Sequence, residues 1–174
     1  VTGVQTCALP ISFTIKAGMS GLEFLAGIPA SFGGILKMNA GAFNTEIMQL
    51  VEFVNIYSYQ NGFMTIGKQD LDYAYRRLSL PKDSVILGGI VKLMNSTAKA
   101  VQEKVLANHE KRRATQPLNA NTCGSVFKNP SGDYAGRIIE ELGLKGFQVG
   151  GAKISEKHAN FIEYTGNASA KDIL

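Results

Sequence analysis

The chain has 174 residues, 45% of them hydrophobic, which is enough for one sizeable core or two small ones. Its formal net charge of +4 comes without a long lysine–arginine tract, so the composition favours a small anionic ligand over nucleic acid, whose binders present a wider basic face. Two cysteines are too few for a disulfide framework or a cysteine-based metal site, and the apolar runs are too short for a membrane-spanning helix or a secretory signal. We therefore expect no metal, no nucleic-acid partner and no membrane insertion.

The first eleven residues, VTGVQTCALPI, differ from the rest of the chain. They show no clear hydrophobic period and resemble the translation of a sequencing adapter, so we interpret residues 1–11 as a non-native leader. The next segment alternates apolar Phe13, Ile15 and Ala17 with polar residues, which predicts a strand. Residues 169–174 have the pattern of a helix that has only begun, and we expect a fragment truncated at both ends.

A segment rich in small residues follows, GIPASFGG at residues 27–34, and leads into MNAGAF at residues 38–43. It leaves backbone N–H groups uncovered ahead of a helix N-terminus, which is a favourable place for a phosphate or pyrophosphate. The segment matches neither a Walker loop nor a GxGxxG dinucleotide motif. The alternative is ordinary packing of a helix against small residues.

Residues 46–57 and 63–66 are rich in β-branched and aromatic side chains and flank an Asn61-Gly62 turn signal, which predicts a β-hairpin. Residues 84–93 predict a further strand, with Gly88-Gly89 as a bulge or a close approach of two backbones.

Between these strands, Tyr75-Arg76-Arg77 offers guanidinium groups beside a tyrosine. Arginine is suited to a carboxylate or a developing enolate, because its fork donates two parallel hydrogen bonds. The alternative is a surface arginine whose stem packs on the ring.

The clearest helix covers residues 95–113, with Ser96 or Thr97 as its cap and basic residues in its last turn. Pro117 follows it. We interpret this helix as the connector between two domains.

The most informative run is TCGSVFKNP, residues 122–130, which places a hydroxyl, a cation and a carboxamide between a glycine and a proline. If residues 125–129 form a short strand, Ser125, Phe127 and Asn129 point to one face and Lys128 to the other. The alternative is a turn that feeds a surface strand.

Further on, residues 135–142 predict a helix facing a core, residues 147–154 a short strand and turn, and residues 159–164 another strand. His158 has no acid or cysteine partner in motif spacing, so we expect it to form a hydrogen bond with a ligand or the backbone rather than to bind a metal.

Three runs together resemble one family. They are GLEFLAGIPASFGGILKMNAGAF at residues 21–43, GSVFKNP at residues 124–130 with the preceding Arg112 and Gln116-Pro117, and LGLKGFQVGGAKISEKHANFI at residues 142–162. Their order and spacing are similar to those of UDP-N-acetylenolpyruvoylglucosamine reductases, the MurB-type flavoenzymes of peptidoglycan precursor synthesis. The resemblance implies an α+β protein in which part of an FAD-binding domain of the vanillyl-alcohol-oxidase type precedes a small α+β substrate-binding domain.

The same resemblance implies a division of the chain. Residues 12–96 would be the partial FAD-binding domain, residues 97–113 the connecting helix and residues 114–174 the partial substrate-binding domain. NADPH would reduce the FAD, and hydride would pass from the flavin to the enolpyruvyl double bond of a nucleotide-sugar substrate to give UDP-N-acetylmuramate. We expect such an enzyme to be a cytoplasmic monomer.

By this resemblance, Ser125 would donate the proton that completes the reduction, and Arg76 would bind the substrate carboxylate and stabilise the enolate. The other substrate-binding residues implied are Tyr75, Gln116, Lys128, Asn129 and His158. The implied flavin pyrophosphate region comprises Ile28, Pro29, Ala30, Ser31, Gly33, Gly34, Asn39 and Gly41. A third catalytic residue, a glutamate, would lie beyond Leu174, so we expect the chain by itself to be inactive.

Two other classes of function stay open from the residues alone. The small-residue loop and the Ser125 stretch would also suit a non-catalytic module that binds a nucleotide or nucleotide sugar. A basic interaction protein that binds nucleic acid is the third candidate.

Overall fold

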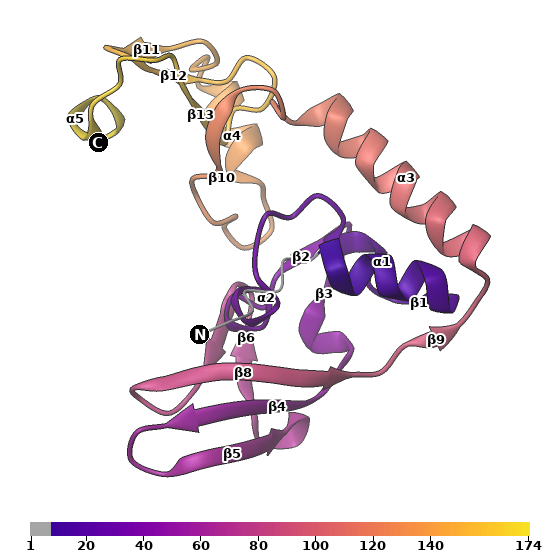
Figure 1. The fold of residues 1–174 in the computed structure, drawn as a ribbon. Coiled ribbons are helices and arrows are strands. Elements are labelled where there is room, and N and C mark those ends of the chain that lie inside the picture. Colours follow the sequence, from indigo (N-terminus) through magenta and orange to yellow (C-terminus); the bar gives the residue numbers. More distant parts are fainter. Residues whose placement is uncertain (1–7) are drawn as a thin grey trace. The chain divides into compact units, whose positions relative to one another are not determined.

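The computed structural model describes residues 8–174 as a mixture of helices and antiparallel strands (Figure 1), the α+β class that the sequence predicts. The chain divides into two compact units, an N-terminal unit that ends at His109 and a C-terminal unit, Glu110–Leu174. The division falls inside α3 (Ala98–Thr115), which confirms the helix predicted at residues 95–113. Thr97 caps it by accepting from the Ala100 N–H at 3.2 Å. No helix within residues 8–174 is long and apolar enough to cross a membrane.

The segment around Phe13 and Ile15 is a helix, α1 (Ala8–Ala17), so the predicted strand is wrong. Ile11, Thr14 and Gly18 are buried, a spacing that fits one face of a helix, whereas Phe13 is 69% exposed. Ile11 packs into the hydrophobic core. Burial of this face outweighs the strand preference of the β-branched residues.

Helix α1 begins inside the segment interpreted as a non-native leader. Residues 1–7 of that segment lie outside the described part of the chain. The foreign origin of residues 1–11 therefore stays a prediction.

Short elements connect α1 to the main sheet of the N-terminal unit. They are β1 (Met19–Ser20), η1 (Glu23–Leu25), α2 (Phe32–Lys37), β2 (Gly41–Ala42), β3 (Thr45–Glu46) and η2 (Ile47–Gln49). β2 pairs with β3, and β1 pairs with β9 (Met94–Asn95). The β1–β9 pair brings the two ends of this unit together.

The predicted hairpin is confirmed, because β4 (Val51–Ser58) pairs with β5 (Gly62–Gly67). Its first strand begins later than predicted, since residues 47–49 form η2. On its other edge β4 pairs with β8 (Ser84–Val91), which gives the order β5–β4–β8.

Both interpretations of Gly88-Gly89 are confirmed. The register of β4 and β8 shifts between Asn55, which pairs with Gly88, and Ile56, which pairs with Ile86, as at a bulge. A Cβ on Gly89 would lie 2.8 Å from the Phe53 carbonyl oxygen, so the two backbones approach too closely for a side chain.

A second hairpin follows η3 (Lys68–Asp70) and consists of β6 (Asp72–Ala74) and β7 (Arg77–Ser79). Its turn is Tyr75-Arg76, the pair that the sequence analysis selected.

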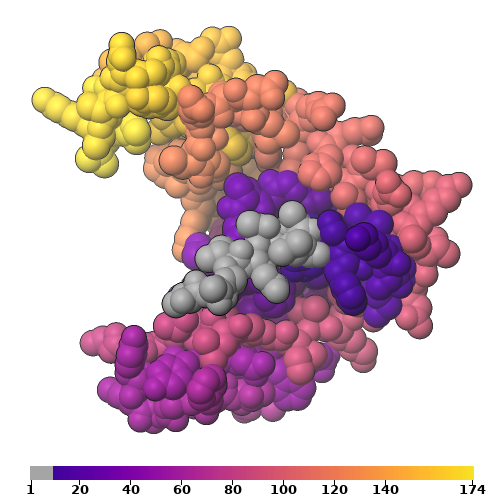
Figure 2. All heavy atoms as spheres, viewed as in Figure 1, coloured from indigo at the N-terminus to yellow at the C-terminus, as the bar shows by residue number. Residues whose placement is uncertain are grey.

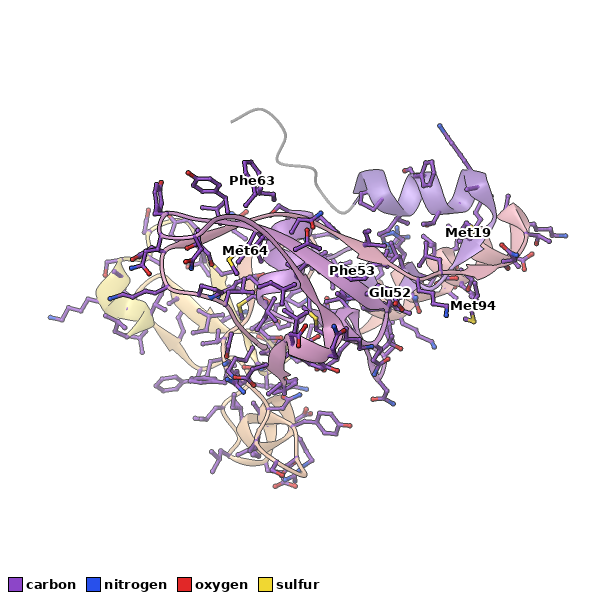
Figure 3. All side chains as sticks on the ribbon, turned by 90° about the horizontal axis from the view of Figure 1, so that it is seen from below. Met19, Glu52, Phe53, Phe63, Met64 and Met94 are labelled. Carbon is purple, nitrogen blue, oxygen red and sulfur yellow. The ribbon has the colours of Figure 1, made fainter. Side chains whose placement is uncertain are left out.

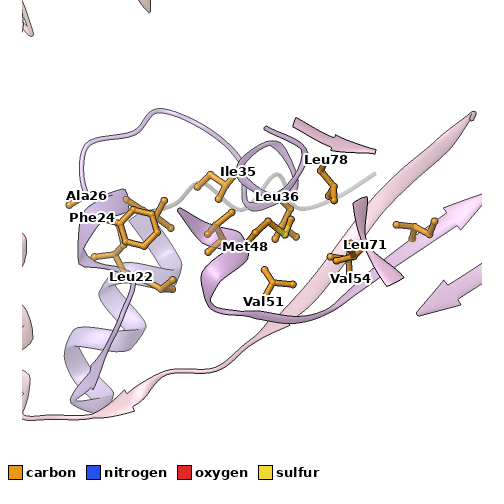
Figure 4. Packing of buried hydrophobic residues seen from close by; sticks show 14 of the residues in the cluster. Leu22, Phe24, Ala26, Ile35, Leu36, Met48, Val51, Val54, Leu71 and Leu78 are labelled. Carbon is orange, nitrogen blue, oxygen red and sulfur yellow. The ribbon is translucent and has the colours of Figure 1, made fainter. Parts of the chain in front are cut away.

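The core of the N-terminal unit lies under one face of the sheet. Figure 4 shows Leu36 of α2 and Met48 of η2 near Val51 and Val54 of β4, and all four side chains are fully buried. Each such side chain contributes about 1.5–3 kcal/mol by burial. This packing fixes α2 and, with it, the small-residue segment that precedes the helix.

The opposite face of the sheet carries exposed apolar side chains. Phe53, Tyr57, Phe63, Val85 and Ile90 are between 37% and 79% exposed, and Phe63 projects from the hairpin into solvent (Figure 3). Tyr57 packs edge-on against Phe63 with ring centroids 5.2 Å apart. The atoms of β4 and β5 form a continuous surface in Figure 2.

The C-terminal unit is a four-stranded antiparallel sheet of order β10–β13–β12–β11 with the short helices α4 and α5. The strands are β10 (Asn121–Ser125), β11 (Gln148–Val149), β12 (Ala152–Ile154) and β13 (Phe161–Tyr164), and the helices are α4 (Ala135–Glu141) and α5 (Ala170–Ile173). The helix predicted at residues 135–142 and the strand predicted at residues 159–164 are confirmed, and residues 147–154 contain two short strands, β11 and β12, instead of one.

Residues 125–129 do not form the short strand considered above, because β10 ends at Ser125 instead of beginning there. Gly124 has a φ of 84° and the β10–β13 register shifts between Thr122 and Ser125, so the strand is already irregular before it ends. Beyond Ser125, a side chain instead of a strand takes the backbone hydrogen bonds of Phe127. The alternation of Ser125, Phe127 and Asn129 therefore does not describe one sheet face.

Candidate functional site

The small-residue segment forms the N-terminus of α2. Ser31 is the N-cap, and its hydroxyl oxygen accepts from the Gly34 N–H at 3.1 Å. The first N–H groups of a helix have no intrahelical partner, so those of Phe32 and Gly33 are presented at this end. The donors for an anion here are thus backbone groups, as expected, although Ser31 already satisfies one of them.

The turn before α2 contains Ile28, Pro29 and Ala30. The Ala30 N–H donates to the Ile28 carbonyl oxygen at 3.0 Å, and both side chains pack against the core while Pro29 is exposed. The predicted cofactor segment is therefore a fixed turn rather than a loose loop.

Asn39 is a buried structural centre. It adopts a left-handed φ of 40° and is fully buried. Its amide nitrogen donates to Glu46 at 2.8 Å and to the Ala74 carbonyl oxygen at 3.0 Å, and its amide oxygen accepts from the Met48 N–H at 3.2 Å. The Asn39 backbone N–H donates to the Leu36 carbonyl oxygen at 3.0 Å, so its side chain and its N–H are both bonded within the protein.

Arg76 reaches the same place from the β6–β7 turn. Its guanidinium donates to the carbonyl oxygens of Asn39 at 3.2 Å and Gly41 at 2.8 Å, and it lies 3.5 Å from the Glu46 carboxylate. The structure thus brings together the predicted catalytic arginine and two residues of the predicted cofactor segment. Glu46, which holds both Asn39 and Arg76, was missed by the sequence analysis.

The two arginines that follow Tyr75 have different partners. The Arg76 guanidinium lies 4.7 Å from the centroid of the Tyr75 ring, a cation–π contact. Arg77 instead forms a bidentate pair with Asp72, with both distances 2.8 Å, on the surface. Arg77 is thus a surface arginine paired with a carboxylate, whereas the contact with the tyrosine ring is made by Arg76.

Ser125 lies at the end of β10 and is exposed. Within the described residues its hydroxyl makes no hydrogen bond, so it is available to a ligand. The next two residues are held in place: the Val126 N–H donates to the Asn160 carbonyl oxygen at 2.9 Å, and the Asn160 side chain binds the backbone of Phe127.

Lys128 and Asn129 complete the stretch. Lys128 is exposed. The Asn129 amide oxygen accepts from the Ala135 N–H at 3.1 Å and so caps α4 from outside the helix. Asn129 thus has a structural role that its sequence position did not indicate.

Gln116 lies apart from this stretch, in a hollow of about 780 Å³ at the end of α3. The hollow is also lined by Arg113, Lys153, Lys157 and Glu163. Val126 and Phe127 line a different, mainly apolar hollow of about 400 Å³. The structure does not bring Gln116 together with Ser125.

His158 forms the backbone hydrogen bond that we expected. Its Nδ1 accepts from the Asn160 N–H at 3.2 Å, and its ring packs against Phe161 with centroids 4.7 Å apart. Burial lowers the pKa of His158 below its ordinary value of 6.5, which favours the neutral ring that this bond requires. The described residues contain no group of three or more His, Cys, Asp or Glu placed to hold a metal.

Comparisons with known proteins identify relatives of this chain. A family profile described as UDP-N-acetylenolpyruvoylglucosamine reductase, C-terminal domain, matches residues 116–174. The UDP-N-acetylenolpyruvoylglucosamine reductase of Clostridium tetani is 44% identical over 160 residues, which are 91% of this chain and 52% of the relative. The Bacillus subtilis reductase is 40% identical over 161 residues, 91% of this chain and 53% of that protein. The chain is a homologue of UDP-N-acetylenolpyruvoylglucosamine reductase.

A solved structure supports the same relationship. The crystal structure of UDP-N-acetylenolpyruvylglucosamine reductase (MurB) from Thermus caldophilus matches with a TM-score of 0.89 and 37% identity, over 97% of this chain and 62% of that one. The chain spans about half the length of the curated reductases that it matches. Ser125 and Asn160 lie in the part matched by the reductase C-terminal domain, whereas Arg76 lies outside it.

Proposed function

We propose that this chain is part of a flavoprotein that reduces UDP-N-acetylglucosamine enolpyruvate to UDP-N-acetylmuramate in the cytoplasm, with FAD as cofactor and NADPH as hydride donor. The observation that carries the proposal is Ser125, whose exposed hydroxyl lies on a fixed segment inside the stretch matched by the reductase C-terminal domain. The names of the relatives supply the reaction.

The residues proposed to hold the FAD pyrophosphate fit a phosphate group. The N–H groups of Phe32 and Gly33 are available at the N-terminus of α2. A Cβ on Gly41 would lie 2.4 Å from the Thr45 carbonyl oxygen, so only glycine fits there. Bound FAD would accept hydride from NADPH and deliver it to the enolpyruvyl double bond.

Arg76 is the proposed carboxylate and enolate ligand. Two of its donors are fixed on backbone carbonyl groups, and its side chain is still 28% exposed. A guanidinium held in this way needs little reorganisation when negative charge develops on the substrate. The substrate carboxylate would then share the guanidinium with Glu46.

Ser125 is the proposed proton donor to the carbon that becomes negative in the reaction. A serine hydroxyl is a weak acid, so its placement matters more than matching of pKa values. The hydrogen bonds to Val126 and Phe127 would supply that placement, and exposed Lys128 would reach the anionic part of the nucleotide sugar.

A chimera tests the proposal, with the matched part of this chain replacing its counterpart of 160 residues in the Clostridium tetani reductase. We expect a yellow protein with flavin absorbance whose oxidation of NADPH depends on the enolpyruvyl nucleotide sugar. The unaltered Clostridium tetani protein is the control. A colourless chimera that binds the nucleotide sugar without oxidising NADPH would favour the non-catalytic module, and salt-sensitive DNA binding without flavin would favour the nucleic-acid candidate.

A further inference from the structure

Asn160 is a buried polar residue in an apolar run. It lies between Ala159 and Phe161, and all three residues are less than 9% exposed. A buried carboxamide is stable only when its donor and acceptor groups have partners. The partners of Asn160 therefore show what the residue does.

The Asn160 side chain is paired with one backbone unit. Its amide oxygen accepts from the Phe127 N–H at 2.9 Å, and its amide nitrogen donates to the Phe127 carbonyl oxygen at 2.8 Å. A peptide group of a neighbouring β-strand would offer the same donor and acceptor. The Asn160 carboxamide thus replaces a strand neighbour at the point where β10 has ended.

The Asn160 backbone extends this pairing in both directions. Its carbonyl oxygen accepts from the Val126 N–H at 2.9 Å, and its N–H donates to the His158 Nδ1 at 3.2 Å. One position earlier, Ser125 pairs with Phe161 in the register of β10 and β13. Ser125, Val126 and Phe127 are therefore fixed successively by Phe161 and Asn160.

We infer that Asn160 is the positioning residue of the Ser125 stretch: its carboxamide fixes Phe127 and so sets the direction in which the chain leaves Ser125. The catalytic consequence rests on the proposed function, in which Ser125 gives a proton to the substrate. The clamp, which is the pair of hydrogen bonds between the Asn160 carboxamide and Phe127, does not depend on that function, so the clamp and its catalytic consequence are tested separately.

Amide hydrogen exchange in the 174-residue chain tests the clamp. Asn160→Ala removes both side-chain bonds, and we expect exchange of the Phe127 amide to accelerate by about tenfold, the scale of one hydrogen bond. The Gly146 and Ile154 amides, bonded within the same unit, report whether the unit is folded. Unchanged exchange at Phe127 with these reference amides intact would overturn the inference.

If the alanine variant unfolds, Asn160→Asp tests whether the side chain at position 160 contacts Phe127. The carboxylate keeps an acceptor for the Phe127 N–H but loses the donor to its carbonyl group. We expect the amide chemical shift of Phe127 to follow the titration of the new carboxyl group, because the two are in direct contact. An amide chemical shift of Phe127 that does not change with this titration would contradict the inferred clamp.

The catalytic consequence is read in the chimera by separating the two half-reactions. In Asn160→Ala we expect flavin reduction by NADPH to stay within about twofold and substrate reduction to slow by about 10–100-fold. Thr165→Val, which removes the bond to the Gly151 carbonyl oxygen elsewhere in the unit, is the matched control and should change neither rate. Equal loss in both half-reactions would reduce Asn160 to a general structural role. If Ser125→Ala leaves substrate reduction unchanged, the proposed function fails, while the exchange result still stands for the clamp.

Discussion

Asn39 and Asn44 both adopt left-handed backbone angles, with φ values of 40° and 61°, but their surroundings differ. Asn39 is fully buried with three side-chain hydrogen bonds, whereas Asn44 is exposed. Asn39→Ala should destabilise the chain by about 2–4 kcal/mol, because it leaves buried groups such as the Met48 N–H without their partner. Urea unfolding measures this.

Asn44→Ala is the matched control for the backbone angle. It should cost about 1 kcal/mol, since it changes only the preference for a left-handed conformation. An equal loss of stability in the two variants would assign the effect to the backbone angle instead of the hydrogen bonds.

Ser125→Ala in the chimera tests the proposed proton donor. Flavin reduction by NADPH should be nearly intact, while substrate reduction should slow by about 10²–10⁴-fold, the usual contribution of a positioned acid. Stopped-flow absorbance of the flavin separates the two steps. Normal turnover would remove Ser125 from the mechanism.

The residues that the sequence revealed and those that it concealed differ in a physical way. Arg76 and Ser125 stand in short local motifs, so the family resemblance selects them. Glu46 and Asn160 act through partners about 30 positions away, Arg76 and Phe127 respectively. Only the tertiary fold gives an ordinary glutamate or asparagine that meaning; the signal available for Asn160 was a lone carboxamide in an apolar run.

At the scale of elements, α3 is attached to the N-terminal unit by a polar contact. The Glu23 carboxylate accepts from the Ser20 hydroxyl at 2.6 Å and the Gly21 N–H at 2.7 Å, with Lys104 of α3 at 3.8 Å. Asn108 of α3 donates to the Glu23 carbonyl oxygen at 2.9 Å. Burial alone would raise the pKa of Glu23, but the hydrogen bonds that its carboxylate accepts, from Ser20 and Gly21 among others, and the charge of Lys104 outweigh it and lower the pKa below 4.5.

The stability that Glu23 contributes should therefore be present above pH 4.5 and be lost as the pH falls through its lowered folded-state pKa. Glu23→Gln should destabilise the chain by about 1–3 kcal/mol at pH 7 and flatten this acid dependence. Lys104→Met should have a smaller effect, because the lysine side chain is 59% exposed. Urea titrations between pH 3 and 7 compare the variants, and a larger loss in Lys104→Met would contradict this ranking.

The C-terminal unit should respond to pH through His158. Burial lowers the pKa of His158, Lys145 acts in the same direction, and Glu140 opposes them. Its contribution to stability should be complete above pH 6.5 and decline as the pH falls through the folded-state value, because a protonated Nδ1 cannot accept the Asn160 N–H. Protection of the Asn160 amide from exchange, compared with the intrinsic exchange rate at each pH between 7.5 and 5.5, measures this effect. His158→Gln should abolish the pH dependence of that protection.

Elements were predictable where local pattern and tertiary packing agree. The β4–β5 hairpin has a turn signal and matching strands, and α3 has a cap and a terminating proline. The strand interpretations of the segment Ala8–Ala17 and of the stretch after Ser125 failed for one reason. An alternation of apolar and polar residues over five positions is too short to distinguish the period of a strand from other patterns. Packing of Ile11 into the core favours a helix in the segment Ala8–Ala17. After Ser125, the Asn160 carboxamide takes the place of a neighbouring strand.

For the whole molecule, the chain spans about half the length of the curated relatives that it matches. We expect the 174-residue chain to be inactive and to retain FAD weakly. Gel filtration with added FAD, followed by absorbance of the protein peak, measures retention. Stoichiometric FAD in that peak would show that the present residues suffice.

Helix α3 also has a practical consequence. Because it runs through the boundary at His109 and Glu110, a cut between the two compact units would break a continuous helix. The piece Glu110–Thr115 is far shorter than the roughly 12–15 residues that an isolated helix needs in water, so it would fray. Gln116, whose N–H donates to the Arg112 carbonyl oxygen, would lose its anchor. A gene junction placed before Ala98 would keep α3 whole in the C-terminal piece, but it would take Lys104 and Asn108, the partners of Glu23, away from the N-terminal unit.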